Sequence, residues 1–341
     1  MRRKGCEAMA AGEPAGSPGE AVGAAHVPDW ARPQLATLTK DRFSDPGWLF
    51  ERKLDGERLL AFRDASGVRL LTRNDRDVTT VFPEVAGALR AQRADEFAVD
   101  GEVVALRDGQ TRFGLLQQRL GVAHPEPGLI EDFPVFYYIF DVLFAGGLDV
   151  RGRPQRERKQ TLKELLDFTG PLRYTEHRAG DGEAFYRQAC RDGWEGLIAK
   201  RADAPYSGGR TRDWLKFKCV TSQELVIGGY TDPRGSRPGL GALLVGYHDA
   251  DGRLTYAGKV GTGFTADRLR SLHASLSALE RGTSPFAGGK PPRAGTHWVE
   301  PRLVAQIAFA EWTADGLLRQ PRFEGLRDDK DPAEVVRETP G

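Results

Sequence analysis

Cysteine is scarce in this chain of 341 residues, which contains only Cys6, Cys190 and Cys219. The three stand far apart and form no Cys-x-x-Cys pair, so the sequence predicts neither a zinc cluster nor a disulfide framework. Three isolated thiols are typical of a protein of the reducing cytosol. We therefore expect a cytoplasmic protein.

Long hydrophobic runs and a strong charge of either sign are also lacking. No apolar run approaches the roughly eighteen residues that span a membrane, and no secretory signal follows Met1. The formal net charge is +1, so composition gives no support for nucleic-acid binding, although a local basic face stays possible. Residues 1–27 are rich in Ala, Gly, Pro and Glu, which predicts a disordered tail or a start site placed too early.

Folded patterns begin near Trp30 and predict a first domain over residues 28–221. We expect a β-hairpin over 59–71, a buried strand over 134–144, strands over 97–99 and 102–106 separated by an Asp-Gly turn, and helices over 83–93, 155–168 and 183–191. Strands and helices mix without a strict βαβ rhythm. This order favours the α+β class with antiparallel sheets.

A second domain is predicted over residues 222–341, where short strands are joined by Gly-rich turns. Strands are expected over 225–230, 243–247, 254–257, 298–299 and 304–312. One helix should begin after Thr265, with Leu269, Leu272, Leu276 and Leu279 on one face. About five strands with one helix indicate a small barrel of the OB type.

The most informative motif is the octet from Glu51 to Arg58, which reads Glu-Arg-Lys-Leu-Asp-Gly-Glu-Arg. Asp-Gly favours a tight turn directly after Lys53, because Gly tolerates positive φ. A lysine amine becomes a nucleophile only when its pKa falls or its proton is removed, and acidic neighbours alone raise the pKa. A metal or further lysines must then complete the site. Taken alone, Lys-x-Asp-Gly is more typical of a surface hairpin with a solvated lysine than of a nucleophile.

Two further patterns suit phosphate chemistry. Lys216 and Lys218 alternate with Leu215 and Phe217, so a strand would present both amines on one face. Such a pair forms a cradle for a polyphosphate, or else a solvated strand face. Glu102 and Glu195 are candidates for a magnesium site, because Mg²⁺ takes one or two carboxylates and fills its other positions with water and phosphate.

The ordered set of motifs resembles the covalent nucleotidyltransferase superfamily and, within it, ATP-dependent DNA ligases. The likeness is greatest to the ligase module of bacterial non-homologous end-joining ligases and covers about residues 28–335. It rests on the order Lys-x-Asp-Gly-x-Arg, Asp-Gly-Glu, Phe-Asp-x-Leu, Glu-Gly-Leu-Ile-x-Lys, Trp-Leu-Lys-x-Lys and Arg-x-Asp-Lys. No single motif is specific, whereas the series is.

The resemblance implies a role for each matching residue. Lys53 resembles the nucleophile that attacks the α-phosphate of ATP and keeps AMP as a phosphoramidate. The other implied contacts are Glu51 to the adenine edge, Arg58 and Arg73 to ribose and phosphates, Glu102 and Glu195 to ribose or metal, Phe140 stacked on adenine, Lys216 and Lys218 to the α-phosphate, and Arg327 and Lys330 to the leaving pyrophosphate. From the apolar strand alone, Phe140 is equally a core residue.

ATP with Mg²⁺ or Mn²⁺ is the expected cofactor, because NAD-dependent ligases carry an extra upstream domain and a four-cysteine zinc site. The resemblance implies a monomer that acts on DNA with nicks or ends, with a Ku-like end-binding partner and a hinge over residues 219–224. Arg210 and Arg212 are candidate contacts to DNA phosphates or residues of a solvated loop. An RNA ligase or mRNA-capping guanylyltransferase of the same superfamily, and a non-catalytic nucleic-acid-binding scaffold, remain alternatives.

Overall fold

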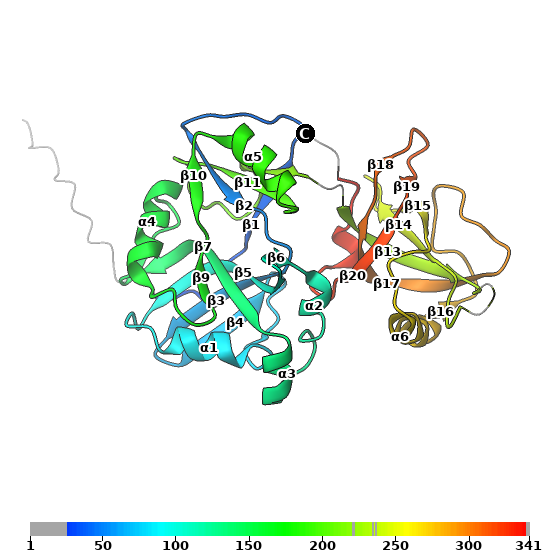
Figure 1. Cartoon of the computed structure of the whole chain (residues 1–341), viewed down its shortest axis with the longest axis horizontal. Helices are drawn as coiled ribbons and strands as arrows, with labels where there is room; N and C mark the ends of the chain where they lie inside the picture. Colours follow the sequence, from blue (N-terminus) through cyan, green and yellow to red (C-terminus); the bar gives the residue numbers. More distant parts are fainter. Residues whose placement is uncertain (1–25, 220–221, 234, 236, 339–341) are drawn as a thin grey trace, which may run out of the picture.

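The computed structural model describes residues 26–219, 222–233, 235 and 237–338, which form two lobes (Figure 1). The first lobe runs from β1 (Gln34–Leu38) to β12 (Gly209–Lys218), and the second runs from β13 (Ser222–Thr231) to the 3₁₀ turn η1 (Pro332–Glu334). The predicted boundary at Thr221 and nearly all of the predicted tail over 1–27 lie outside the described residues. No described helix has both the length and the apolar character that a membrane crossing requires.

Two sheets build the first lobe, and most of their strand pairs are antiparallel. One sheet has the order β1-β12-β11-β2-β10, which adds β2 (Trp48–Arg52), β10 (His177–Ala179) and β11 (Gly196–Arg201). The other has the order β4-β3-β5-β7-β8, with β6 beside β5 and β9 beside β7. Its strands are β3 (Glu57–Asp64), β4 (Gly67–Thr72), β5 (Phe97–Arg107), β6 (Gln110–Thr111), β7 (Val135–Ala145), β8 (Leu148–Asp149) and β9 (Leu172–Tyr174).

Helices lie around these sheets (Figure 1). They are α1 (Pro83–Arg90), α2 (Phe113–Leu116), α3 (Pro127–Asp132), α4 (Gln155–Leu165) and α5 (Gly182–Arg191). The three helices expected over 83–93, 155–168 and 183–191 are confirmed as α1, α4 and α5, with ends that differ by one to three residues. Proline in the first turn explains why α1 begins there. Proline has no backbone N–H, and the first N–H groups of a helix have no partner within the helix.

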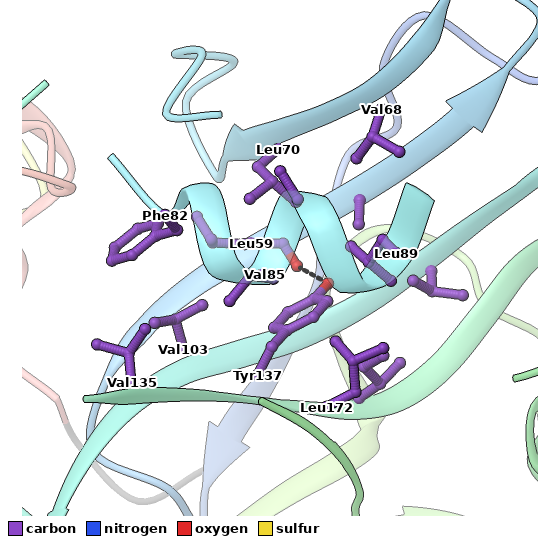
Figure 2. Packing of buried hydrophobic residues seen from close by; sticks show 14 of the residues in the cluster. Leu59, Val68, Leu70, Phe82, Val85, Leu89, Val103, Val135, Tyr137 and Leu172 are labelled. Atoms are coloured by element: carbon purple, nitrogen blue, oxygen red, sulfur yellow. Dashed lines mark hydrogen bonds between the residues drawn. The ribbon is translucent and has the colours of Figure 1, made fainter. Parts of the chain in front are cut away.

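The core of the first lobe lies between α1 and the sheet of β3, β5 and β7 (Figure 2). Phe82, Val85 and Leu89 of this helical segment are fully buried against apolar strand residues such as Leu59. Burial of each such side chain contributes about 1.5–3 kcal/mol. The buried Tyr137 hydroxyl donates a hydrogen bond of 2.8 Å to the carbonyl of Leu59, so its polar group is satisfied inside the core.

Two predicted breaks in strands are wrong. Asp100 and Gly101 do not form a turn, because β5 runs unbroken through them and pairs with β3 and β7 on its two sides. Gly101 is needed for close packing: a Cβ atom there would stand 2.5 Å from the ring of Tyr137. In the second lobe, the strands expected at 298–299 and 304–312 are largely one strand, β17 (Thr296–Ala308).

The second lobe is a strongly curved sheet closed by one helix, as expected for an OB-type barrel. Its strand order is β15-β14-β13-β17-β16, with β20 beside β17 and a small pair β18-β19. The remaining bounds are β14 (Leu243–His248), β15 (Leu254–Val260), β16 (Glu280–Arg281), β18 (Glu311–Trp312), β19 (Leu318–Arg319), β20 (Arg322–Leu326) and α6 (Ala266–Ser277). The predicted cap is confirmed, since the Thr265 side chain accepts a hydrogen bond from the backbone N–H of Arg268.

The expectation of isolated thiols is wrong for two of the three cysteines. Cys190, near the end of α5, and Cys219, directly after β12, form a disulfide, with Cα atoms 5.2 Å apart. Helix α5 packs against β11 beside β12, and the Tyr186 hydroxyl donates to the carbonyl of Lys218 at 2.9 Å. Residues far apart in sequence are thereby brought together, which spacing alone does not reveal. The cysteine count therefore no longer supports a reducing compartment.

Candidate active site

Lys53 lies in the short connection between the two sheets of the first lobe. The strand before it, β2, belongs to one sheet and the strand after it, β3, belongs to the other, so the segment is not a hairpin. The backbone N–H of Lys53 donates to the carbonyl of Gly196 at 2.9 Å. Gly56 has no positive φ, contrary to the expected turn. Glycine is required there because a Cβ atom would stand 2.1 Å from the carbonyl of Val103.

The environment of the Lys53 ammonium group is acidic. Its Nζ lies 2.5 Å from a carboxylate oxygen of Glu195, and the two side chains are only 20% and 15% exposed. Burial opposes the charged amine, but the carboxylates of Glu195, Glu102 and Asp55 outweigh it and raise the pKa of Lys53. The lysine is therefore held protonated in this arrangement, and must lose a proton before it can act as a nucleophile.

Strand pairing places Arg58 and Glu102 beside each other on two neighbouring strands. Arg58 of β3 stands directly opposite Glu102 of β5. Burial raises the pKa of the Glu102 carboxyl to about 7, although the nearby cations Arg58 and Lys53 lower it. Glu102 is therefore a partly buried carboxyl whose charge depends on the cations around it.

A β-bulge directs Phe140 toward the cavity. Asp100 pairs with Asp141 and Gly101 pairs with Ile139, so Phe140 is the extra residue of β7 at this point. A bulge of this kind redirects a side chain out of the regular alternation. The ring of Phe140 meets the edge of Trp214 at 6.0 Å between centroids and lies under the Arg58 guanidinium at 4.5 Å. Phe140 is thus both a buried residue and part of the cavity wall.

Buried ion pairs fix the charged residues beside Phe140. Arg58 forms a two-pronged ion pair with the fully buried Asp100. Asp100 also accepts a hydrogen bond of 2.6 Å from the hydroxyl of Tyr206. These contacts hold the guanidinium in one orientation, as charge-assisted bidentate pairs do. The resemblance gave Arg58 a role in binding, and Asp100 and Tyr206 are the residues that position it.

Glu51 is enclosed by two lysines that were not singled out from the sequence. Its carboxylate oxygens lie 2.9 Å from Lys159 Nζ and 2.7 Å from Lys200 Nζ, and the exposure of all three side chains is 1–2%. Burial lowers the pKa of Lys200 to about 8, despite the attraction of Glu51 and Asp141. We call Glu51, Arg58, Phe140, Lys200 and Trp214 the inner end of the cavity.

The other end of the cavity lies between the two lobes. Lys216 and Lys218 of β12 point from the same strand face, as predicted, while Leu215 and Phe217 are buried. Both lysines contact the carboxylate of Glu338 from the second lobe, Lys218 at 3.0 Å.

Arg73, Arg327 and Lys330 also lie at this end and complete its set of cations. Arg73 forms an ion pair with Glu334, Arg327 donates twice to Asp329 at 2.8 Å, and Lys330 lies 3.4 Å from Glu224. We call Arg73, Lys216, Lys218, Arg327 and Lys330 the interdomain end.

One cavity of about 230 Å³ joins both ends. Its lining includes all but one of the residues predicted from sequence, namely Glu51, Lys53, Arg58, Arg73, Glu102, Phe140, Glu195, Arg210, Lys216, Lys218, Arg327 and Lys330. The exception is Arg212. Both Arg210 and Arg212 are exposed on β12 rather than in a loop, and Arg210 donates to the carbonyl of Ala36 at 2.7 Å.

Two sequence families match this chain. The ATP dependent DNA ligase domain matches residues 33–218, and the ATP dependent DNA ligase C terminal region matches residues 236–330. The first match alone covers more than half of the chain. The chain belongs to the ATP-dependent DNA ligase family. The two matches fall on the first and second lobes respectively.

Individual ligases of the family show how far the similarity extends. The chain is 38% identical to the multifunctional non-homologous end joining protein LigD of Pseudomonas aeruginosa over 347 aligned residues, which cover 100% of this chain and 40% of that protein. It is 40% identical to the LigD DNA repair protein of Mycobacterium tuberculosis strain H37Rv over 85% of this chain and 37% of that protein. The chain therefore spans about two fifths of the curated relatives it matches.

A solved ligase structure shares the arrangement of the fold. The structure of mycobacterial DNA ligase D complexed with ATP and MES has a TM-score of 0.65 and 36% identity. The alignment covers 91% of this chain and 99% of that one. The fold expected from the motifs, a nucleotidyltransferase domain followed by an OB-type domain, is confirmed.

Several residues that shape this ligase cavity were missed by the sequence reasoning. Lys200 stood in the quoted Glu-Gly-Leu-Ile-Ala-Lys motif and Trp214 in the next one, so a signal existed for both. Lys159, Tyr206 and Glu338 belong to no quoted motif. Their contacts depend on the packing of α4, the loop before β12 and the C-terminal segment, and no local sequence pattern predicts them.

Proposed function

We propose that this chain is an ATP-dependent DNA ligase that joins a 3′-hydroxyl to a 5′-phosphate through an AMP carried on Lys53. The observation that supports this most is the position of Lys53 in one cavity with an aromatic inner end and a cationic interdomain end. A planar base suits the first and a polyphosphate suits the second. Protein groups in phosphoryl transfer mainly position the reactants and neutralise charge.

The reaction begins at the Lys53 amine. In the first step Nζ attacks the α-phosphorus of ATP, an N–P bond forms, the P–O bond to the β-phosphate breaks, and pyrophosphate leaves. The proton of Nζ must leave first, and Glu195 is the carboxylate hydrogen-bonded to it. A cation bound to the phosphates of ATP would partly neutralise the carboxylates that raise the pKa of Lys53, and would thereby lower that pKa.

We assign the expected nucleotide contacts to the two ends of the cavity. Phe140 stacks on adenine, Glu51 accepts from its edge, and Arg58 contacts ribose or phosphate. At the interdomain end, Lys216 and Lys218 contact the α-phosphate, while Arg73, Arg327 and Lys330 contact the phosphates that leave. A cationic end of this kind stabilises the charge that develops on pyrophosphate.

The next two steps transfer the AMP and join the DNA. An oxygen of the DNA 5′-phosphate attacks the phosphorus of the lysyl adenylate, a P–O bond forms, and the Lys53–phosphorus bond breaks. The 3′-hydroxyl then attacks the 5′-phosphate, a phosphodiester forms, and AMP leaves. Arg210 and Arg212 contact DNA phosphates, so nick binding should weaken steeply as salt rises.

Glu102 and Glu195 fit a magnesium ion by the chemistry of their donors. They are two of the three carboxylates around Lys53, and a hard cation with phosphate ligands needs only one or two carboxylates. Among the described residues no group of three or more His, Cys, Asp or Glu side chains is arranged for a metal. Glu102 and Glu195 would hold a Mg²⁺ or Mn²⁺ ion together with substrate phosphates, and the ion would supply charge neutralisation there.

The biological role that we infer is the joining of broken DNA ends in a bacterial cytoplasm by a monomer. The relatives named for non-homologous end joining support this assignment. A Ku-like protein that binds ends is the expected partner. RNA ends and GTP should be poor substrates, and a panel of nicked DNA, broken DNA and nicked RNA measures this preference.

The deciding experiment measures covalent labelling of Lys53. The wild-type chain is incubated with radiolabelled ATP and Mg²⁺ and then denatured, and Lys53→Ala is compared with Lys163→Ala, an exposed lysine of α4. We expect labelled protein in the wild type and in the Lys163 variant, and none in Lys53→Ala. The Lys53 variant should still seal a nick that already carries the 5′-adenylate, because that step needs no amine. A wild-type protein without label would refute the proposal.

A further inference from the structure

A short acidic segment of the second lobe reaches into the cavity between the lobes. We call residues 334–338 the acidic strap. Glu334, Val335, Val336 and Glu338 all line the cavity together with the lysines of β12. The strap follows Arg327 and Lys330 in the chain, and so belongs to the lobe that closes the interdomain end.

The two carboxylates of the strap contact three of the cations assigned to phosphate. Glu338 holds Lys216 with one oxygen and Lys218 with the other, the latter at 3.0 Å, and its side chain is 17% exposed. Glu334 forms an ion pair with Arg73. Burial opposes the charge of Glu338, but the two lysines outweigh it and lower its pKa to about 2. Glu338 is therefore an anion at neutral pH.

The strap is attached to the second lobe rather than to the first. The carbonyl of Val335 accepts from the backbone N–H of His248 at 2.8 Å. Gln223 binds the strap twice, since its side chain donates to the carbonyl of Val336 at 2.9 Å and accepts from the N–H of Glu338 at 3.0 Å. Val335 is also buried in an apolar cluster of this lobe. The strap must therefore move with the second lobe when the lobes separate.

We propose that Glu338 competes with the phosphates of ATP for Lys216 and Lys218, so that the strap sets the ATP concentration at which Lys53 is charged. A carboxylate presents two anionic oxygens to the lysine pair, as a phosphate does. The same ammonium protons cannot serve both ligands. This inference rests on the proposed function, in which the lysine pair holds the α-phosphate.

If Glu338 competes with ATP, removing its charge should improve ATP binding. Removing a contact that only stabilises the fold would give no such improvement. Glu338→Gln removes the charge but keeps the size and the backbone contacts of the strap. In the full chain we expect the KM for ATP in Lys53 labelling to fall about fivefold, the factor that corresponds to roughly 1 kcal/mol for the competing contacts of Glu338 with the two lysines. The maximal labelling rate should stay the same, and Glu338→Ala should behave alike.

Matched variants separate competition from a general effect of charge. Glu311→Gln removes an exposed carboxylate of the same lobe, paired with Arg319 at 2.6 Å, and should leave the KM unchanged. Glu338→Asp keeps the charge on a shorter side chain and should give an intermediate KM. If Glu338→Gln melts at a lower temperature than the wild type, the KM of Glu338→Asp is used to test the competition instead.

A binding measurement tests the same competition without the labelling reaction. Inorganic tripolyphosphate should bind the Glu338→Gln chain more tightly than the wild type in calorimetry. An unchanged or raised KM with normal labelling in the wild type would overturn the role of Glu338 and leave the proposed function intact. A wild type that takes no label would overturn the proposed function, while tripolyphosphate binding would still decide the competition.

Discussion

The two ends of the cavity use ion pairs in opposite ways. At the inner end, both partners of each pair belong to the first lobe: Glu51 and Lys200 are each 2% exposed, and Arg58, 17% exposed, pairs with the fully buried Asp100. At the interdomain end, Arg73 pairs with Glu334 across the lobes, and the Glu334 side chain is 57% exposed. The inner pairs therefore belong to a fixed wall of one lobe, whereas the pairs of Arg73, Lys216 and Lys218 with the acidic strap belong to a contact between the two lobes.

This difference suits the order of events in the proposed reaction. A base must be recognised by groups that are already oriented, because their alignment then costs nothing at the moment of binding. Pyrophosphate must leave and DNA must enter, so the contacts at the interdomain end have to break in each cycle. The pair of Arg73 with the exposed Glu334 resists this movement little, whereas the less exposed contacts of Lys216 and Lys218 with Glu338 have to be replaced by other ligands.

The largest effect should come from breaking an inner pair. Asp100→Ala leaves the Arg58 guanidinium without its partner and removes the acceptor of the Tyr206 hydroxyl. We expect a loss of about 3–5 kcal/mol in the free energy of unfolding, measured with urea at neutral pH. Asp95→Ala is the matched control, since Asp95 pairs with Arg63 at 3.0 Å but is 90% exposed. It should lose less than about 1 kcal/mol. Equal losses in the two variants would contradict the assignment of Asp100 to a buried, fixed wall of the cavity.

A smaller effect is expected at Glu57, which faces the interdomain end from the first lobe. Burial first, and then the charge of Asp329, raise the pKa of Glu57 to about 8 from the ordinary 4.5. The folded protein thus holds this proton more tightly than the unfolded chain. Its contribution to stability is complete below about pH 4.5 and is lost as the pH rises through 8.

Glu57→Gln removes this titration while keeping the shape of the side chain. At pH 8 the variant should be more stable than the wild type by roughly 1–3 kcal/mol, and the difference should vanish near pH 4. Urea unfolding at a series of pH values measures both quantities. Glu131→Gln, on an exposed position of α3, should show no such trend. A Glu57 variant that is less stable at pH 8 would show that the carboxylate makes a favourable ionic contact there.

Most of the cavity residues were predicted through the resemblance of the ordered motifs to those of ATP-dependent DNA ligases, and only a few through residue chemistry and strand position. Alternation alone placed Lys216 and Lys218 on one face, and the structure confirms this. The motif around Lys53 was found, but the reason given for Gly56 was wrong. That glycine lets β3 approach β5 closely and does not supply a positive φ.

The rest depended on contacts between distant segments. Phe140 was ambiguous because only the register of β5 with β7 shows it to be the extra residue of a bulge. The disulfide between Cys190 and Cys219 needs α5 to pack beside β12, and the contact of Glu338 needs two lobes to meet. Each of these follows from tertiary packing, which local pattern and propensity do not encode.

The smallest effect should come from the pair that joins the lobes at Arg73. In a double-mutant cycle of Arg73→Gln and Glu334→Gln, we expect a coupling energy below about 1 kcal/mol in the free energy of unfolding, because Glu334 stays largely exposed. The coupling should also shrink as salt is raised from low to physiological concentration, since solvent screens such a pair. Urea unfolding without ATP measures each corner of the cycle. A coupling energy above about 2 kcal/mol that does not change with salt would mean that the two lobes are held together as strongly as the buried pairs of the inner end. Nucleotide binding would then have to separate the lobes, because the contacts between them would be too strong to break on their own.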